Sequence, residues 1–155
     1  MSGTAFAGAA AAVGAPRSQM GIATTCYLTA WRPKDTLEFF RHCNELGAGG
    51  IQASLAGLDA AGLKQLREQA ENAGMYIEAR GGLPRAGVEA FEKNVMAAKE
   101  VGALCIRTAC LSGRRYETFS SLADWRKFVS DSEAAIARAI PILEKLRVRM
   151  ALENH

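Results

Sequence analysis

The last eight residues of the chain decide which α/β fold is expected. They read Val148-Arg149-Met150-Ala151-Leu152-Glu153-Asn154-His155. Successive side chains of a strand point to opposite faces, so Val148, Met150 and Leu152 share one face while Glu153 and His155 share the other. Central strands of an open parallel sheet are covered on both faces and are apolar almost throughout. This alternation instead predicts a strand with one face under helices and the other polar near its end.

Working backwards, four similar segments precede this one. Strands are expected at residues 21–27, 50–55, 75–80 and 103–108. In the third, Glu78 and Arg80 are expected on the polar face and Tyr76 on the outer face. In the fourth, Leu104 and Ile106 oppose Cys105 and Arg107. The five strands are separated by helical patterns, which predicts a βα repeat with parallel pairing and right-handed crossovers.

The helices are recognised by their caps and their spacing. Asp35 with Glu38, Asp59, and Ser121 with Asp124 read as N-terminal capping signals. Glycines at 47, 74 and 102 end the first three helices. Residues 112–120 read as a polar loop, and Pro141 is expected to kink the long last helix or break its final turn.

Two folds compete for this pattern: an open flavodoxin-type sheet and part of a (βα)8 barrel. A complete barrel is about 250 residues, so five of its eight units need roughly 156, and the chain has 155 residues. A flavodoxin-type sheet needs a helix after its fifth strand, which this sequence does not contain. We therefore expect an α/β fold, a partial TIM barrel of the form (βα)4β over residues 20–155, cut short before the remaining strands.

Residues 1–19 stand apart as a small, alanine-rich segment. They are expected to be a disordered leader or the remnant of an export signal, although no basic residue precedes Arg17. The location expected for the protein is cytoplasmic, with export as the alternative if this segment is such a remnant.

Composition excludes several classes of protein. At 49% apolar and 23% charged residues the chain is an ordinary globular protein. It has no apolar run of about 18 residues, so no membrane span is expected. A net charge of +3 is too weak to indicate nucleic-acid binding. Four cysteines without a CxxC pair are read as reduced thiols rather than as a disulfide scaffold.

In a βα barrel the active site lies at the carboxyl ends of the strands. The candidates at those ends are Tyr27, Gln52, Ser54, Glu78, Arg80, Arg107, Glu153 and His155, and the loops add Arg85, Arg114, Arg115, Tyr116 and Glu117. Glu153 and His155 share a strand face and both can ligate a metal. The alternative for Glu153 is a structural ion pair with Arg80 or Arg107.

Arginines form the second group of candidates. Converging guanidiniums suit a phosphate, carboxylate or polyhydroxy substrate. Arg107 is expected to face the site, whereas exposed loop arginines such as Arg114 and Arg115 often only solvate their loop. His42 and the cysteines at 105 and 110 are expected to have no chemical role.

Three stretches carry a resemblance to a known family. They are MGIATTCY (Met20–Tyr27), CIRTACLSGRRYE (Cys105–Glu117) and ALENH (Ala151–His155). Together they resemble the sugar phosphate isomerase/epimerase superfamily, the xylose isomerase-like TIM barrels, over the first five of eight strands. That group also includes the endonuclease IV-type enzymes.

The resemblance implies a metal-dependent sugar or sugar-phosphate isomerase or epimerase that transfers a proton through an enediolate. Glu153 corresponds to the first ligand of a divalent metal (Mn, Mg, Co or Zn) and to a catalytic carboxylate. Arg80, Arg107, Arg115 and His155 are the expected substrate-binding residues. The family's remaining ligands, an Asp, a His and a second Glu, come from strands that this sequence lacks, so the chain alone is expected to be inactive.

Two alternatives stay open. An endonuclease IV-like phosphodiesterase needs several histidines at strand ends, and the chain has two. A non-catalytic half-barrel would self-associate or dock onto a partner, because it leaves strand edges and apolar surface exposed. The expected partners are therefore a small sugar or sugar phosphate and either a second copy or the missing C-terminal half, with no nucleic acid and no membrane.

Overall fold

The computed structural model describes residues 18–27 and 31–153. The expected leader, apart from Ser18 and Gln19, lies outside the described residues, as do Asn154 and His155. The strands are β1 (Gly21–Ala23), β2 (Gly50–Ser54), β3 (Tyr76–Arg80), β4 (Cys105–Ala109) and β5 (Met150–Glu153). The helices are α1 (Thr36–Glu45), α2 (Ala60–Ala73), α3 (Glu89–Glu100), α4 (Arg115–Thr118) and α5 (Leu122–Leu146), with a 3-10 turn η1 (Thr24–Tyr27) after β1.

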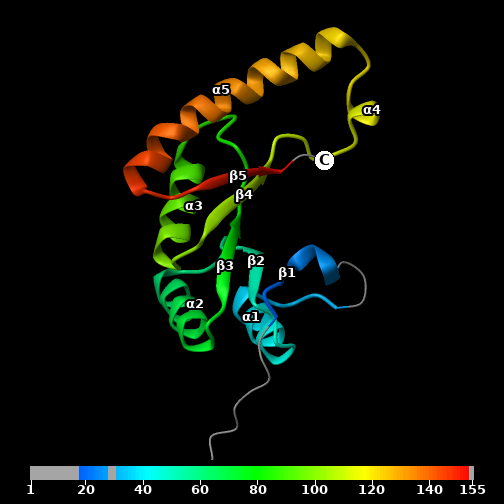
Figure 1. Ribbon diagram of the computed structural model, residues 1–155. Helices are drawn as coiled ribbons and strands as arrows, with labels where there is room; N and C mark the ends of the chain where they lie inside the picture. The colour runs from blue at the N-terminus through cyan, green and yellow to red at the C-terminus, as the bar shows by residue number, and fades with distance from the viewer. Residues whose placement is uncertain (1–17, 28–30, 154–155) are drawn as a thin grey trace, which may run out of the picture.

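The five strands form one parallel sheet in the order β1-β2-β3-β4-β5. Each strand therefore pairs with its neighbour along the chain, as in a barrel, whereas a flavodoxin-type sheet reorders its strands. Figure 1 shows the curved sheet with α1, α2, α3 and α5 following its outer side. The sheet is not closed, so β1 and β5 are its two edges within the described residues. This confirms the expected partial TIM barrel.

Three helices begin at the expected capping residues. The carboxylate of Asp35 accepts a hydrogen bond from the Glu38 N–H at 2.7 Å, and that of Asp59 from the Gly62 N–H at 2.8 Å. The Ser121 hydroxyl accepts one from the Asp124 N–H at 3.1 Å. Each bond satisfies one of the amide groups that a helix N-terminus leaves without an intrahelical partner. The predicted starts of α1, α2 and α5 are confirmed.

Two local expectations were wrong, and of the two effects expected of Pro141 the break of the last turn does not occur. The first strand ends at Ala23, and Thr24–Tyr27 turns into η1. The polar loop contains the single helical turn α4. Helix α5 runs unbroken through Pro141 to Leu146. Burial of Ala139 and Leu143 on either side of this proline offsets the one backbone hydrogen bond that its ring removes.

The hydrophobic core lies between the helices and the outer face of the sheet. Ile51, Ile77 and Ile106 point into it from β2, β3 and β4, and all three are at most 2% exposed. The helices contribute Phe39, Phe40, Cys43, Leu66, Phe91 and Val95. The expected alternation is confirmed, because the residues on either side of each isoleucine along its strand face the other side of the sheet. Within the described residues, no helix is both long enough and apolar enough to cross a membrane.

Tyr76 corrects one expected orientation. It shares the inner face with Glu78 and Arg80, and its ring lies over two neighbouring glycines in register with it, Gly50 and Gly21. A Cβ on Gly50 would lie 2.4 Å from the Tyr76 ring. The glycines provide the space that this ring fills, so Tyr76 closes the bottom of the inner face instead of packing under the helices.

Candidate functional site

Strand register places the inner-face residues in rows. One row is Gln52, Glu78 and Cys105, in which the Gln52 amide donates to the Glu78 carboxylate at 2.9 Å. The next row, one step closer to the carboxyl ends, is Ser54, Arg80 and Arg107. Rows of side chains from adjacent strands are how a βα barrel fills its interior. The rows become more polar toward the carboxyl ends of the strands, where a barrel carries its active site.

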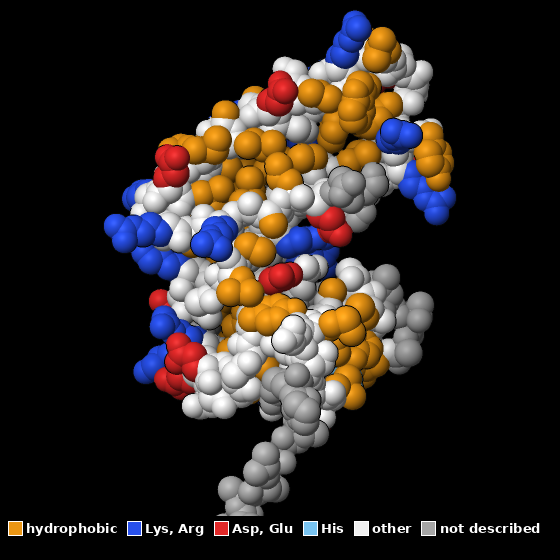
Figure 2. Space-filling view, in the orientation of Figure 1, with side chains coloured by type: hydrophobic (Ala, Val, Ile, Leu, Met, Phe, Trp, Pro, Cys, Tyr) orange, Lys and Arg blue, Asp and Glu red, His pale blue; other side chains and the backbone are white. Residues whose placement is uncertain are grey.

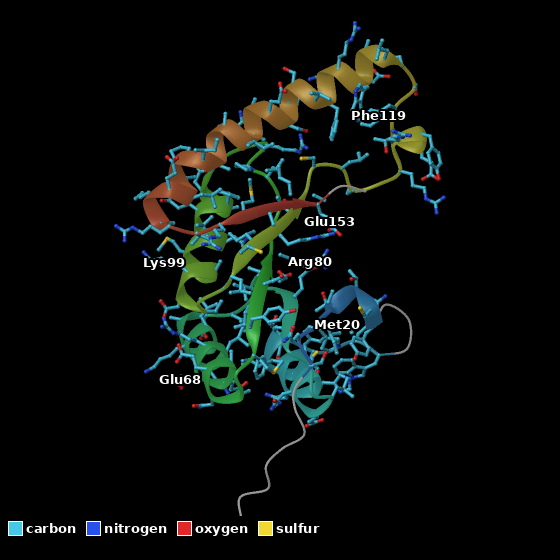
Figure 3. The ribbon with its side chains drawn as sticks, in the orientation of Figure 1. Met20, Glu68, Arg80, Lys99, Phe119 and Glu153 are labelled. Carbon is cyan, nitrogen blue, oxygen red and sulfur yellow. The ribbon has the colours of Figure 1, made fainter. Side chains whose placement is uncertain are left out.

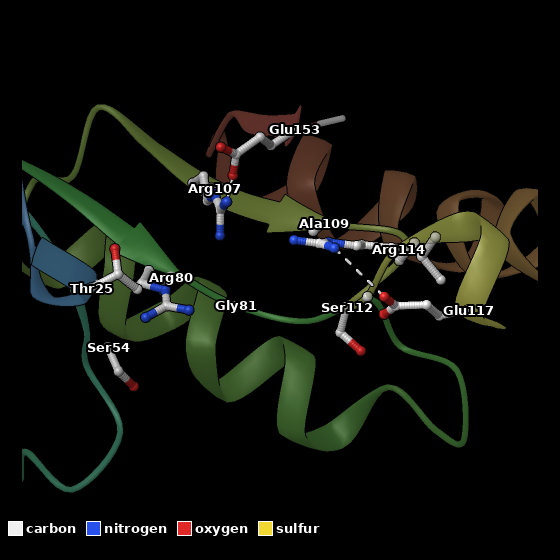
Figure 4. Close-up of a pocket in the computed structure, with 12 residues that line it drawn as sticks. Thr25, Ser54, Arg80, Gly81, Arg107, Ala109, Ser112, Arg114, Glu117 and Glu153 are labelled. Carbon is white, nitrogen blue, oxygen red and sulfur yellow. Dashed lines mark ion pairs between the residues drawn. The ribbon is translucent and has the colours of Figure 1, made fainter. Parts of the chain in front are cut away.

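An open cavity of about 1060 Å³ lies at those carboxyl ends. We call it the mouth cavity; Figure 4 shows it in close-up. It is lined by Thr25, Ser54, Arg80, Gly81, Arg107, Ala109, Leu111, Ser112, Gly113, Arg114, Glu117 and Glu153. Four strands, β2 to β5, thus line one cavity together with η1, the loop before α4 and α4 itself.

Glu153 forms an ion pair with Arg107 across the β4–β5 pair. The Arg107 side chain is 19% exposed and that of Glu153 is 44% exposed, so the pair sits at the wall of the cavity. This is one of the two partners expected for Glu153 as a structural ion pair. The pairing holds the carboxylate at the mouth and holds Arg107 on the inner face.

Arg80 lies beside this pair, on the neighbouring strand. Its Nη1 donates to the Thr24 hydroxyl at 3.4 Å, and its backbone carbonyl accepts from the Asn94 amide at 3.4 Å. A Cβ on Gly81 would come within 2.3 Å of the Asn94 amide nitrogen. The glycine therefore permits α3 to approach the end of β3 and fix the backbone on which Arg80 sits.

The three arginines of the loops differ in position and in contacts. Arg114 lines the mouth cavity and lies 3.6 Å from Glu117. Arg115, expected to bind substrate, begins α4 and is not among the residues that line the cavity. Arg85 donates to the Cys110 carbonyl at 2.8 Å and lies over the Phe128 ring, so it ties the β3–α3 loop to α5.

Tyr27, one of the expected strand-end residues, packs away from the mouth cavity. Its ring contacts those of Trp31, Phe39 and His42 edge to face. Burial, together with the nearby thiols of Cys43 and Cys26, raises the pKa of the Tyr27 phenol. Tyr27 and His42 thus belong to an aromatic cluster formed by α1 and the residues before it.

Two cysteines have raised pKa values. Burial raises the pKa of Cys43 to about 11. Burial, followed by the negative charge of Glu78, raises the pKa of Cys105. Because the thiolate is the nucleophile, neither thiol is suited to nucleophilic catalysis at neutral pH.

Sequence reasoning missed the hydroxyl side chains of Thr25 and Ser112 in the mouth cavity. Both lie outside the strands, in η1 and in the loop after β4, where strand alternation carries no information. The small polar residues that follow each expected strand would have indicated Ser112, because such residues surround the mouth of a barrel. Thr25 lies inside the stretch 21–27 that the sequence predicts as a strand, so this signal does not reach it.

The described residues do not complete a metal site. No three of their His, Cys, Asp or Glu side chains cluster closely enough to hold an ion. Glu153 offers one hard oxygen donor, and that donor is paired with Arg107. The described residues therefore offer fewer clustered donors than the several ligands that divalent sites of this kind need.

Comparison with solved structures finds the same fold in sugar epimerases. A D-tagatose 3-epimerase-like protein matches with a TM-score of 0.64 at 14% identity, over 88% of this chain and 53% of its own. An L-ribulose 3-epimerase matches at 0.60 and 18%, over 86% and 48%. A protein of Sinorhizobium meliloti 1021 matches at 0.59 and 18%, over 86% and 50%.

At these identities the likeness establishes the fold. The resemblance to xylose isomerase-like barrels is confirmed at that level, and the chain spans about half the length of the structures it matches. Comparisons with protein-family models and with curated proteins find no match.

Proposed function

We propose that this chain forms the first half of the active site of a sugar isomerase or epimerase. The observation that supports the proposal is the mouth cavity, in which Arg80, Arg107 and Glu153 converge at the carboxyl ends of three adjacent parallel strands. The shared fold with a D-tagatose 3-epimerase-like protein and an L-ribulose 3-epimerase agrees with it. The substrate class that follows is a small sugar or sugar phosphate.

Each candidate residue has a proposed role. Arg80 and Arg107 bind the substrate, and Arg115 and His155 are retained as further candidates for this role. Glu153 is the catalytic carboxylate and one ligand of a divalent metal such as Mn, Mg, Co or Zn. The described residues hold no cluster of three or more His, Cys, Asp or Glu side chains that would complete such a metal site.

By itself, the 155-residue chain is proposed to lack turnover. Moving a proton between neighbouring sugar carbons needs a base and an acid whose pKa values suit the exchange. The two carboxylates of the mouth cavity, Glu117 and Glu153, each form an ion pair with an arginine. Glu78 lies one row deeper and accepts from Gln52. Each of these three carboxylates thus already has a partner within the described residues.

The test uses D-tagatose and L-ribulose, the sugars in the names of two similar structures. Each is added to isotopically labelled chain, and amide chemical shifts are followed by NMR. We expect shifts at Gly81 and at residues 107–114, with none on α2. In D₂O, we expect no deuterium to enter the sugar. Binding elsewhere, or none, would contradict the proposed site, and deuterium incorporation would contradict the proposed inactivity alone.

The alternative enzyme class has no comparable support. A phosphodiesterase of the endonuclease IV type needs histidines at several strand ends. His42, one of two histidines in the sequence, lies on α1 against Trp31.

For the cellular location, we propose a cytoplasmic protein. All four cysteines are free thiols, which agrees with a reducing compartment.

A further inference from the structure

The charges lining the mouth cavity do not balance. Its described lining holds three guanidiniums, of Arg80, Arg107 and Arg114, and two carboxylates, of Glu117 and Glu153. Arg107 pairs with Glu153, and Arg114 lies 3.6 Å from Glu117. Among the described residues no carboxylate lies within ion-pair distance of Arg80. One positive charge is thus left over, and it belongs to Arg80.

Arg80 has few hydrogen-bond partners within the described residues. It is half-buried on the inner face, in register between Ser54 and Arg107. Its one hydrogen bond from the guanidinium to a described side chain is the 3.4 Å contact with the Thr24 hydroxyl. Cations removed from water are normally paired with an anion or fully hydrogen-bonded. The backbone at Arg80 is also fixed by Asn94, so the guanidinium cannot simply move away with its strand.

We propose that Arg80 is the residue that selects an anionic substrate, and that the substrate is a sugar acid bound through one carboxylate. This inference rests on the proposed function, because it concerns the same cavity. A planar guanidinium can donate two parallel hydrogen bonds to a carboxylate. One carboxylate compensates the single surplus charge. In the metal-free chain, a phosphate monoester, which carries about −1.5 to −2 at pH 7, would leave negative charge in excess.

Ser54 adds a second donor at the same place. Its hydroxyl oxygen accepts a hydrogen bond from the Ala56 N–H at 3.2 Å, which leaves its own O–H free to donate into the cavity. Figure 4 shows Ser54 and Thr25 beside Arg80, on the opposite side of the cavity from Arg114 and Glu117. The acid end of the substrate is therefore placed at Arg80 and Ser54, and its hydroxyls face the Arg107–Glu153 pair.

The test is calorimetric titration of the whole chain with D-galacturonate, D-galactose and inorganic phosphate at low salt. Arg80→Gln removes the charge. Arg80→Lys keeps the charge but lacks the planar guanidinium that donates two parallel hydrogen bonds. Arg67→Gln is the matched control, because Arg67 is exposed on α2 and paired with Glu71. Circular dichroism confirms that each variant is folded. A folded Arg80→Lys variant keeps the test valid if Arg80→Gln does not fold.

We expect D-galacturonate to bind at least about tenfold more tightly than D-galactose, and Arg80→Gln to abolish that difference. Arg80→Lys should retain part of it, and Arg67→Gln should retain all of it. Equal binding of the acid and the neutral sugar would overturn the inference while leaving the proposed function intact. Tighter binding of phosphate, or no binding of D-galacturonate, would also overturn it. Absence of the NMR shifts at the mouth cavity with neutral ketoses is the separate failure of the proposed function.

Discussion

At the scale of single residues, the inner face of the sheet is tightly packed where Tyr76 crosses Gly50. A methyl group on Gly50 would lie 2.4 Å from the ring, so either the ring or the strand must move. We expect Gly50→Ala to lower the free energy of unfolding by about 1–3 kcal/mol, measured by urea denaturation. Gly82→Ala is the control, because a Cβ there meets nothing within 4 Å. Equal stability of both variants would contradict the packing described for Tyr76.

Cys43 is a residue whose burial predicts a dependence on pH. Its pKa is raised to about 11 from the ordinary value of 9.0, so the folded state holds the thiol proton more tightly than the unfolded state does. Its contribution to stability is complete below pH 9 and is lost as the pH rises toward 11. Stability of the wild type should therefore fall more steeply over that interval than stability of Cys43→Ala, measured as urea midpoints.

Thiol labelling gives an independent check on the same residue. At pH 8 the exposed Cys26 should react with iodoacetamide, while the buried Cys43 stays unmodified until the chain unfolds. Mass spectrometry of the tryptic peptides separates the two sites. Modification of Cys43 at the rate of Cys26 under native conditions would show that the core beneath α1 is open.

At the scale of elements, the helix caps are the clearest link between sequence and structure. Asp59 caps α2 by accepting from the Gly62 N–H. We expect Asp59→Ala to cost about 1 kcal/mol in thermal or urea unfolding. Asp131→Ala, on the exposed surface of α5 where Asp131 pairs with Lys127, should change stability by less than about 0.5 kcal/mol. Equal losses in the two variants would mean that the cap contributes no more than a surface ion pair.

The sequence predicted these elements because their signals are local. Asp35, Asp59 and Ser121 lie next to the helices that they begin, and strand alternation placed Arg80, Arg107 and Glu153 at one mouth. Alternation along β3 also puts Tyr76 on the face of Glu78 and Arg80, so the expectation of an outward Tyr76 departed from that rule. The space that the Tyr76 ring fills depends on glycines in two other strands, and the role of Arg85 depends on Phe128 in α5. Likewise, the choice of Arg107 as the partner of Glu153 follows from which strands pair. Such properties arise from long-range contacts, so a local pattern does not determine them.

At the scale of the whole molecule, much of the exposed apolar surface lies at the β5 edge of the sheet and on the helices α4 and α5. Of the large hydrophobic side chains that stay exposed, Tyr116, Leu122, Trp125, Ile140 and Leu152 come from α4, α5 and β5. Figure 2 shows hydrophobic side chains gathered over α5 and its N-terminal end, and Figure 3 shows the position of Phe119 beside that end. Exposed apolar surface beside an edge strand favours association with another chain.

We propose from this that the 155-residue chain associates with itself or with a partner that covers β5. Light scattering over a range of concentrations should give masses above the 16.6 kDa of a single chain. Leu152→Lys should reduce the association, because Leu152 is 50% exposed on β5 and a lysine there opposes edge-to-edge pairing. Leu46→Lys is the control: Leu46 is 58% exposed but lies at the end of α1, away from β5. A monodisperse monomer at every concentration would contradict self-association, and an equal effect of both lysines would show that any association does not use β5.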